Sequence, residues 1–134
     1  MRKLEEIAGC MIVDNGKILM VRESWQDYWK IPSGKREPNE PPERTAIRET
    51  KEETGLDVTI TNDYGIYDFS FKRRNFRLYL YGAVIKNGEI SPRKDIEETI
   101  NEVAWLRLNE LTATQNNIPS NRIVLSVYNE ITGI

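Results

Sequence analysis

The sequence contains no histidine and a single cysteine, Cys10, and these absences remove several kinds of chemistry. Without histidine, the chain lacks imidazole as a general base, as the orienter of a nucleophile and as a zinc ligand. One cysteine can form neither an intrachain disulfide nor a thiolate metal cluster, and a reducing cytoplasm is the expected compartment. Acid–base or metal chemistry must therefore use carboxylates, hydroxyls, lysines and backbone oxygens.

Long apolar runs are also missing, so neither a membrane span nor a signal peptide is expected. The 134 residues are 39% hydrophobic and 30% charged, with a net charge of −2. These values are typical of one ordinary globular domain, expected over residues 1–134 as a monomer or homodimer. No long basic track indicates nucleic-acid binding, although cations concentrate locally at Lys72, Arg73, Arg74 and Arg77.

The first half of the chain predicts a hairpin, a loop and a helix. β-prone stretches at residues 7–13 and 17–22 flank Asp14-Asn15-Gly16, a strong hairpin signal. Turn-forming residues between positions 23 and 40 predict a structured loop. Prolines at 41 and 42 suit the first turn of a helix and Gly55 suits its end, so a helix is expected over residues 42–54.

The second half predicts more sheet and a final helix. A cap at Ser120 or Asn121 precedes apolar residues at three- and four-residue steps, which is typical of an amphipathic helix. Strands in groups with two helices indicate a mixed sheet packed between helices. The expected strands lie at residues 56–60, 64–71, 76–85 and 103–108, with turns at 87–88 and 109–111 and an acidic loop between them.

Three carboxylates, Glu49, Glu52 and Glu53, fall on one stripe of the expected helix 42–54. Like charges at this spacing repel by about 0.2–0.5 kcal/mol per pair, and a divalent cation would offset the repulsion. Oxygen ligands suit Mg²⁺ or Mn²⁺, which in turn indicates phosphate chemistry. Taken alone, the cluster is more typical of a solvated surface helix, because glutamate-rich surface helices are common.

The spacing around these carboxylates is more specific, and it resembles the Nudix box. That pattern is Gly, five residues, Glu, seven residues, Arg-Glu, an apolar residue, one residue, Glu-Glu, one residue, Gly and an apolar residue. Thr50 departs from it where an apolar residue is usual, and Ser33 stands where glycine is frequent. The matching positions are Gly34, Glu40, Arg48, Glu49, Glu52, Glu53, Gly55 and Leu56.

The resemblance implies an α/β/α sandwich with a mixed β-sheet, and a role for each residue of the box. Arg48 would pair with Glu40 and Glu52, with an exposed salt bridge as the alternative. Glu40 would anchor the loop to the helix, and Gly34 and Gly55 would supply backbone freedom. Mg²⁺, with Mn²⁺ as a substitute, would be bound by the main-chain carbonyl of Ser33 and by the side chains of Glu49, Glu52 and Glu53.

The implied reaction is attack of water on one phosphorus of a nucleoside diphosphate linked to another group. With no histidine, the base must be a carboxylate or metal-bound hydroxide, and Glu52 and Glu53 are candidates. Some family members place the base in a later loop, which here indicates Glu97 or Glu98. A solvated acidic loop is the alternative for those two residues.

Substrate choice is set outside the box, where the sequence leaves several readings open. Arg22, Lys35 and Arg36 are candidates for phosphate contacts, and one of the aromatic side chains can stack on a base. A nucleoside triphosphate is the favoured substrate; ADP-ribose, nucleotide sugars and dinucleoside polyphosphates remain alternatives. Lys72 replaces a proline that hints at ADP-ribose, and no tyrosine lies between Lys72 and Arg74. A non-catalytic nucleotide- or RNA-binding module, or one that processes RNA 5′ ends, is the rival of another class.

Overall fold

The computed structural model describes residues 3–23, 27–91, 100–110 and 117–133. None of the helices in these segments is long and apolar enough to cross a membrane. The elements in chain order are β1 (Leu4–Asp14), β2 (Lys17–Glu23), β3 (Ser33–Lys35), α1 (Pro42–Thr54), β4 (Asp57–Phe71), β5 (Arg74–Asn87), β6 (Ile100–Arg107), the short 3-10 helix η1 (Leu108–Glu110) and α3 (Pro119–Thr132).

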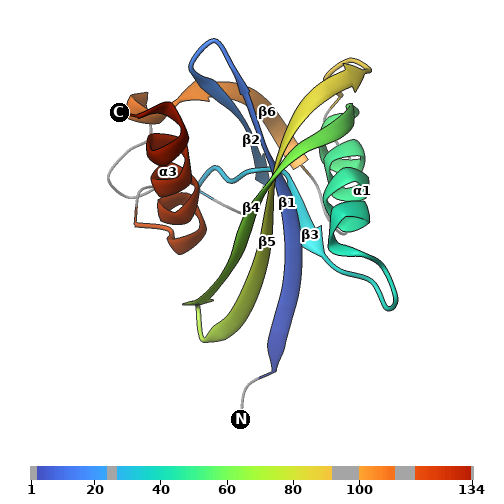
Figure 1. Ribbon diagram of the computed structural model, residues 1–134, viewed down its shortest axis with the longest axis vertical. Coiled ribbons are helices and arrows are strands. Elements are labelled where there is room, and N and C mark those ends of the chain that lie inside the picture. The colour runs from blue at the N-terminus through green and yellow to red at the C-terminus, as the bar shows by residue number, and fades with distance from the viewer. Residues whose placement is uncertain (1–2, 24–26, 92–99, 111–116, 134) are drawn as a thin grey trace.

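A mixed sheet forms the centre of the molecule, with strand order β4-β5-β1-β2-β6 and β3 paired to β1. β1 runs parallel to β5, whereas its pairings with β2 and β3 are antiparallel. The two longer helices, α1 and α3, lie on opposite sides of the sheet (Figure 1). The expected sandwich of a mixed sheet between helices is confirmed.

The side chains of β1 point alternately to the two faces of the sheet, so this strand contributes to both hydrophobic clusters. Ala8, Cys10 and Ile12 face the cluster that includes Ala46 of α1, and Met11 belongs to the cluster that includes Val124 of α3. All six side chains are at most 2% exposed. Successive side chains of a strand point to opposite faces, so β1 holds both helices in fixed positions relative to the sheet.

Two hairpins close on two-residue turns of the same kind. Asn15 and Gly16 join β1 to β2, as predicted, and Lys72 and Arg73 join β4 to β5. All four central residues have positive φ: 51° and 75° in the first turn, 50° and 63° in the second. Positive φ at both central positions defines a type I′ turn, which favours Asn-Gly. The first turn has that pair, whereas the second places two long cationic residues in the left-handed region.

Three expectations were wrong in detail. The loop over residues 23–40 contains β3, a strand too short to show a periodicity, and residues 56–60 and 64–71 are parts of one irregular strand, β4. The cap of the last helix is Ile118, which makes no side-chain capping bond. Asn121 instead lies inside α3, and its side-chain amide donates to the carbonyl of Trp29 at 2.7 Å. Glu97 and Glu98 lie outside the described residues.

Candidate active site

The helix α1 carries the acidic residues, and its limits match the prediction for residues 42–54. Pro42 occupies the first turn, where a missing amide donor costs no hydrogen bond. Gly55 ends the helix in the left-handed conformation at φ 83°, and its amide donates to the carbonyl of Lys51. The predicted backbone role of Gly55 is confirmed, since a residue with a Cβ is strained at this φ.

The two faces of α1 have different environments. Thr50 is fully buried and donates from its hydroxyl to the carbonyl of Ala46 at 2.8 Å, so this departure from the box is accommodated in the core. Glu49 and Glu53 are only 8% and 6% exposed, whereas the side chain of Glu52 is 37% exposed. Two of the three carboxylates are therefore buried, which rules out the simple solvated helix.

The strand β3 holds the buried carboxylates through its main chain. The amide of Ser33 donates to Oε1 of Glu53 at 2.9 Å. A Cβ on Gly34 would lie 2.2 Å from the carboxyl carbon of Glu49, so any other residue here would force this carboxylate to move. Neither Ser33 nor Gly34 has a positive φ. The prediction of backbone freedom at Gly34 was wrong in mechanism, because space beside the backbone is what the position requires.

Arg48 ties the acidic residues of the box together. Its guanidinium donates to both carboxylate oxygens of Glu40, at 2.8 and 3.0 Å, and to Oε1 of Glu49 at 2.9 Å. It also approaches Glu52 at 3.3 Å and donates to the carbonyl of Lys35 at 3.1 Å. Two parallel bonds to one carboxylate fix geometry as well as charge. Arg48 therefore has the predicted pairing and connects α1 to β3.

Glu40 joins the loop to the helix, as predicted. It accepts from the hydroxyl of Thr45 at 2.6 Å and from the amide of Glu37 at 3.1 Å, besides its two bonds from Arg48. The hydrogen bonds from Arg48 are the main cause that lowers the pKa of the Glu40 carboxyl to about 2. Glu40 thus stays ionised over the whole range in which proteins are normally folded.

Burial has the opposite effect on Glu53. Desolvation raises the pKa of its carboxyl to about 8, and the neighbouring charge of Glu49 adds to the shift, while Lys30 opposes it. Lys30 lies just before β3 and forms an ion pair with Glu23 at 3.3 Å. Neither Lys30 nor Glu23 could be singled out from the sequence, because their pairing depends on a bridge between residues 21 and 30. Both contribute to the charge balance around Glu53.

The three candidate phosphate-binding cations have acidic neighbours in this conformation. Arg22 pairs with Glu102, and its guanidinium carbon lies 5.6 Å from the centre of the Trp29 ring. The other two flank the start of β1: Lys35 lies 3.7 Å from Glu5, and Arg36 lies 2.7 Å from Glu6. Lys35 and Arg36 follow Ser33 and Gly34 directly in the chain, whereas Arg22 lies on β2.

A hard divalent cation fits the donor set at this site. Glu49 and Glu53 are buried next to each other, so their negative charges repel. The raised pKa of Glu53 keeps its carboxyl close to neutral, and a bound cation would favour the ionised form. The main chain of β3 lies against both of them, since the amide of Ser33 donates to Glu53 and Gly34 leaves space for the carboxylate of Glu49. Within the described part of the chain, no three acidic side chains already converge on one point. The site is therefore a pair of buried carboxylates against the main chain of β3, in which Arg48 holds Glu49.

Comparison with known proteins decides the family. The family model for the NUDIX domain matches residues 3–126, nearly the whole chain. The chain belongs to the Nudix family. Proteins of this family are pyrophosphohydrolases of nucleoside diphosphate derivatives that use divalent metal ions, and the buried carboxylates described above lie within its characteristic box.

The similar proteins differ in length and in the activity that their names state. The mRNA-decapping enzyme subunit 2 of Arabidopsis thaliana is 30% identical over 115 residues, which is 84% of this chain but 30% of that protein. The 8-oxo-dGTP diphosphatase of Proteus vulgaris is 27% identical over 69% of this chain and 87% of its own length. A solved NUDIX hydrolase from Nitrosomonas europaea superposes with a TM-score of 0.83 at 21% identity, covering 96% of this chain and 90% of that one. This likeness confirms the Nudix fold.

Proposed function

We propose that this Nudix domain is a magnesium-dependent nucleoside triphosphate pyrophosphohydrolase. The observation that carries the proposal is the buried pair Glu49 and Glu53, held against the main chain of β3. Buried carboxylates without a cation are costly, and Mg²⁺ commonly combines one or two carboxylates with phosphate oxygens of a substrate. The similarity to an 8-oxo-dGTP diphosphatase over most of that protein's length supports a triphosphate substrate.

The residues have distinct roles in this proposal. Glu49, Glu52, Glu53 and the carbonyl of Ser33 hold the metal, and Mn²⁺ can replace Mg²⁺. When bound, the metal neutralises diphosphate oxygens and stabilises the charge that develops as the bond breaks. Arg48 acts as a positioning residue, because it holds Glu49 and Glu52 at the same time. Arg22, Lys35 and Arg36 contribute positive charge on the substrate side.

A carboxylate removes the proton from the attacking water, because the chain contains no histidine. Glu52 is the box glutamate most accessible to water, with 37% of its side chain exposed. Glu53 is the alternative within the box, and Glu98 is the alternative in the acidic loop outside the described residues. Gln substitutions at these three positions separate the candidates, since the base is the one whose loss abolishes turnover while metal binding persists.

Hydrolysis of a nucleotide panel tests the function directly. Nucleoside triphosphates, ADP-ribose, a nucleotide sugar and a dinucleoside tetraphosphate are incubated with Mg²⁺, and products are resolved by chromatography. The proposal expects monophosphate and pyrophosphate from the triphosphates, at a higher kcat/KM than from the other substrates. Reaction in ¹⁸O-labelled water then identifies the phosphorus that is attacked. A higher kcat/KM for another member of the panel would show that the triphosphate is not the preferred substrate.

A non-catalytic binding module is the rival hypothesis. Such a module would bind nucleotide without turnover, so wild type and Glu53→Gln would release equal, background amounts of product. Retention of every acidic position of the box, together with the burial of two of them, favours the enzyme.

A further inference from the structure

Lys30 is a largely buried cation to which the proposed reaction gives no role. Its ammonium lies 3.3 Å from a carboxylate oxygen of Glu23, and the two side chains are 21% and 11% exposed. A lysine side chain ordinarily extends its charged end into water. Keeping the ammonium inside the protein costs free energy unless acidic groups lie close to it, so its acidic neighbours indicate what it is for.

The backbone fixes Lys30 in relation to the buried carboxylate of Glu53. Lys30 and Val21 form an antiparallel bridge, with N–H to carbonyl distances of 2.7 and 3.0 Å in the two directions. Three residues after Lys30, the amide of Ser33 donates to Glu53 at 2.9 Å. The segment 30–33 is therefore held to β2 at one end and to α1 at the other.

Glu23 lies on the face of the sheet that α1 covers. Side chains at positions 19, 21 and 23 of β2 share one face, and Leu19 packs in the same cluster as Ala46 of α1. The register shift beside Glu23 adds its extra residue to β6, so β2 keeps its alternation. The ion pair of Lys30 with Glu23 is thus on the side of the sheet that carries Glu53.

Lys30 has the strongest influence on Glu53 among the charges around it. Its ammonium is the main group that opposes the effect of burial on the pKa of the Glu53 carboxyl. Burial by itself would lower the pKa of Lys30, but the charges of Glu53 and Glu23 outweigh it and raise that pKa, so the ammonium stays charged. Among the described residues, Lys30 forms its ion pair with Glu23, and its charge acts on Glu53 through space.

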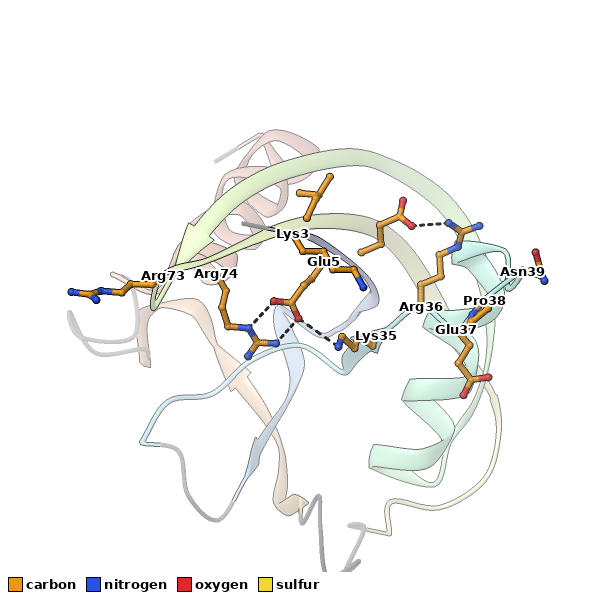
Figure 2. A pocket seen from close by; sticks show the side chains of 11 residues that line it. Lys3, Glu5, Lys35, Arg36, Glu37, Pro38, Asn39, Arg73 and Arg74 are labelled. Atoms are coloured by element: carbon orange, nitrogen blue, oxygen red, sulfur yellow. Dashed lines mark hydrogen bonds and ion pairs between the residues drawn. The ribbon is translucent and has the colours of Figure 1, made fainter. Parts of the chain in front are cut away.

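The other cations near β3 are directed to different carboxylates. Figure 2 shows the side chains of Lys35 and Arg36, which pair with acidic residues at the start of β1. Arg48 donates to the other buried carboxylate of α1. Lys30 is therefore the counter-charge that the fold provides for Glu53.

We propose that Lys30 is a positioning residue of the metal site, an internal counter-ion that limits how tightly the site binds a divalent cation. The proposal rests on the proposed function, because it takes Glu49 and Glu53 to be ligands of that cation. Before the cation binds, the ammonium balances the charge of Glu53, and Glu23 keeps the ammonium in place. An ammonium and a divalent cation beside the same carboxylate repel each other, so Lys30 weakens binding, whereas the negative charge of Glu23 strengthens it. A site of limited affinity fills together with a nucleotide, whose phosphate oxygens add ligands and negative charge.

Opposite shifts in metal affinity distinguish this role from a purely structural one. Titration with Mn²⁺, followed by electron paramagnetic resonance without nucleotide, gives the dissociation constants of wild type, Lys30→Met and Glu23→Gln. We expect Lys30→Met to bind about tenfold more tightly and Glu23→Gln about tenfold more weakly. The double variant should return to within about threefold of wild type, because the two charge changes cancel. Loss of packing alone would weaken binding in both single variants.

Two further sets of variants control for folding and for distant charge. Lys30→Arg keeps the charge and should retain the affinity of wild type within about threefold. Lys51 and Asp57 form an ion pair of 3.4 Å at the end of α1, with side chains 52% and 44% exposed. Lys51→Met and Asp57→Asn should each change the dissociation constant by less than about twofold, since solvent screens exposed charges. If Lys30→Met does not fold, Glu23→Gln must weaken binding and Lys30→Arg must retain it.

Weaker binding in both Lys30→Met and Glu23→Gln, or the affinity of wild type in both, would overturn the inference. Failure of the proposed function has a different signature. If Glu53→Gln binds Mn²⁺ as tightly as wild type, the carboxylates of α1 are not the metal site, and the role of Lys30 fails with it. If Glu53→Gln loses binding while Lys30→Met and Glu23→Gln shift in the same direction, the metal site stands and the counter-ion role alone is wrong.

Discussion

Gly34 lies so close to Glu49 that a single added methyl group would collide with its carboxylate, with a Cβ to carboxyl-carbon distance of 2.2 Å. The close approach places a main-chain segment of β3 against a buried acidic side chain of α1. It explains why the box begins with glycine although the backbone there has no positive φ.

Gly34→Ala should therefore displace Glu49 and impair activity while the fold survives. A displacement of about 1 Å in an active site can cost about 100-fold in rate, and we expect a loss of that order in kcat/KM. The rate of product release with Mg²⁺ measures the effect, and circular dichroism checks folding. Full activity in Gly34→Ala would show that the position of Glu49 is unimportant for the reaction.

The Arg48–Glu40 pair should contribute more to stability than a comparable pair on the surface. Arg48→Ala leaves a partly buried Glu40 without its main partner, and we expect a loss of about 1.5–3 kcal/mol in the free energy of unfolding. Arg77→Ala is the matched control, because Arg77 makes a similar two-bond contact with the exposed Asp68. Such a surface pair contributes about 0–1 kcal/mol. Urea unfolding of both variants gives the comparison, and equal losses would contradict it.

Glu40 should make the stability depend on pH in the acid range. Hydrogen bonds from Arg48 lower the pKa of the folded carboxyl from its ordinary value of 4.5 to about 2. The unfolded chain then binds more protons, so this stabilisation is present above about pH 4.5 and is lost as the pH falls towards 2. Urea unfolding between pH 2 and 6 should show that the free energy of unfolding falls more steeply with falling pH in wild type than in Glu40→Gln. The same pH dependence in both proteins would show that Glu40 is not its cause.

Asn121 should stabilise the segment that leads into the site. Its side chain is buried in α3 and donates to the carbonyl of Trp29, four residues before Ser33. We expect Asn121→Ala to lower the free energy of unfolding by about 1–3 kcal/mol, since a partly buried carbonyl loses a donor. Thr132→Ala, at the exposed end of the same helix, should change it by less than about 0.5 kcal/mol. Equal effects would show that the bond to Trp29 is not important.

The sequence predicted those features that depend on local chemistry. The bounds of α1 follow from prolines at its start and glycine at its end, and the first hairpin follows from Asn15-Gly16. The acidic stripe and the pairing of Arg48 follow from helical spacing and the box.

What the sequence could not predict depends on contacts between distant segments. The pairing of β3 with β1 places Lys35 beside Glu5 and Arg36 beside Glu6, across about thirty residues of chain. The burial of Glu53 against Ser33 has the same origin. Asn121 is a good capping residue by type, but a tertiary bond to Trp29 determines its place inside α3. Tertiary contacts thus determine the partners and positions of these residues, which local propensity does not predict.

The central claim is that carboxylates of α1 bind a divalent cation that is required to cleave a nucleotide diphosphate bond. The most direct measurement is the initial rate of pyrophosphate release from a nucleoside triphosphate by wild type and Glu53→Gln, each with Mg²⁺ and with EDTA. We expect turnover by wild type in Mg²⁺ alone, and a rate at least about 100-fold lower in Glu53→Gln and in EDTA. Equal rates in all four samples would contradict the claim.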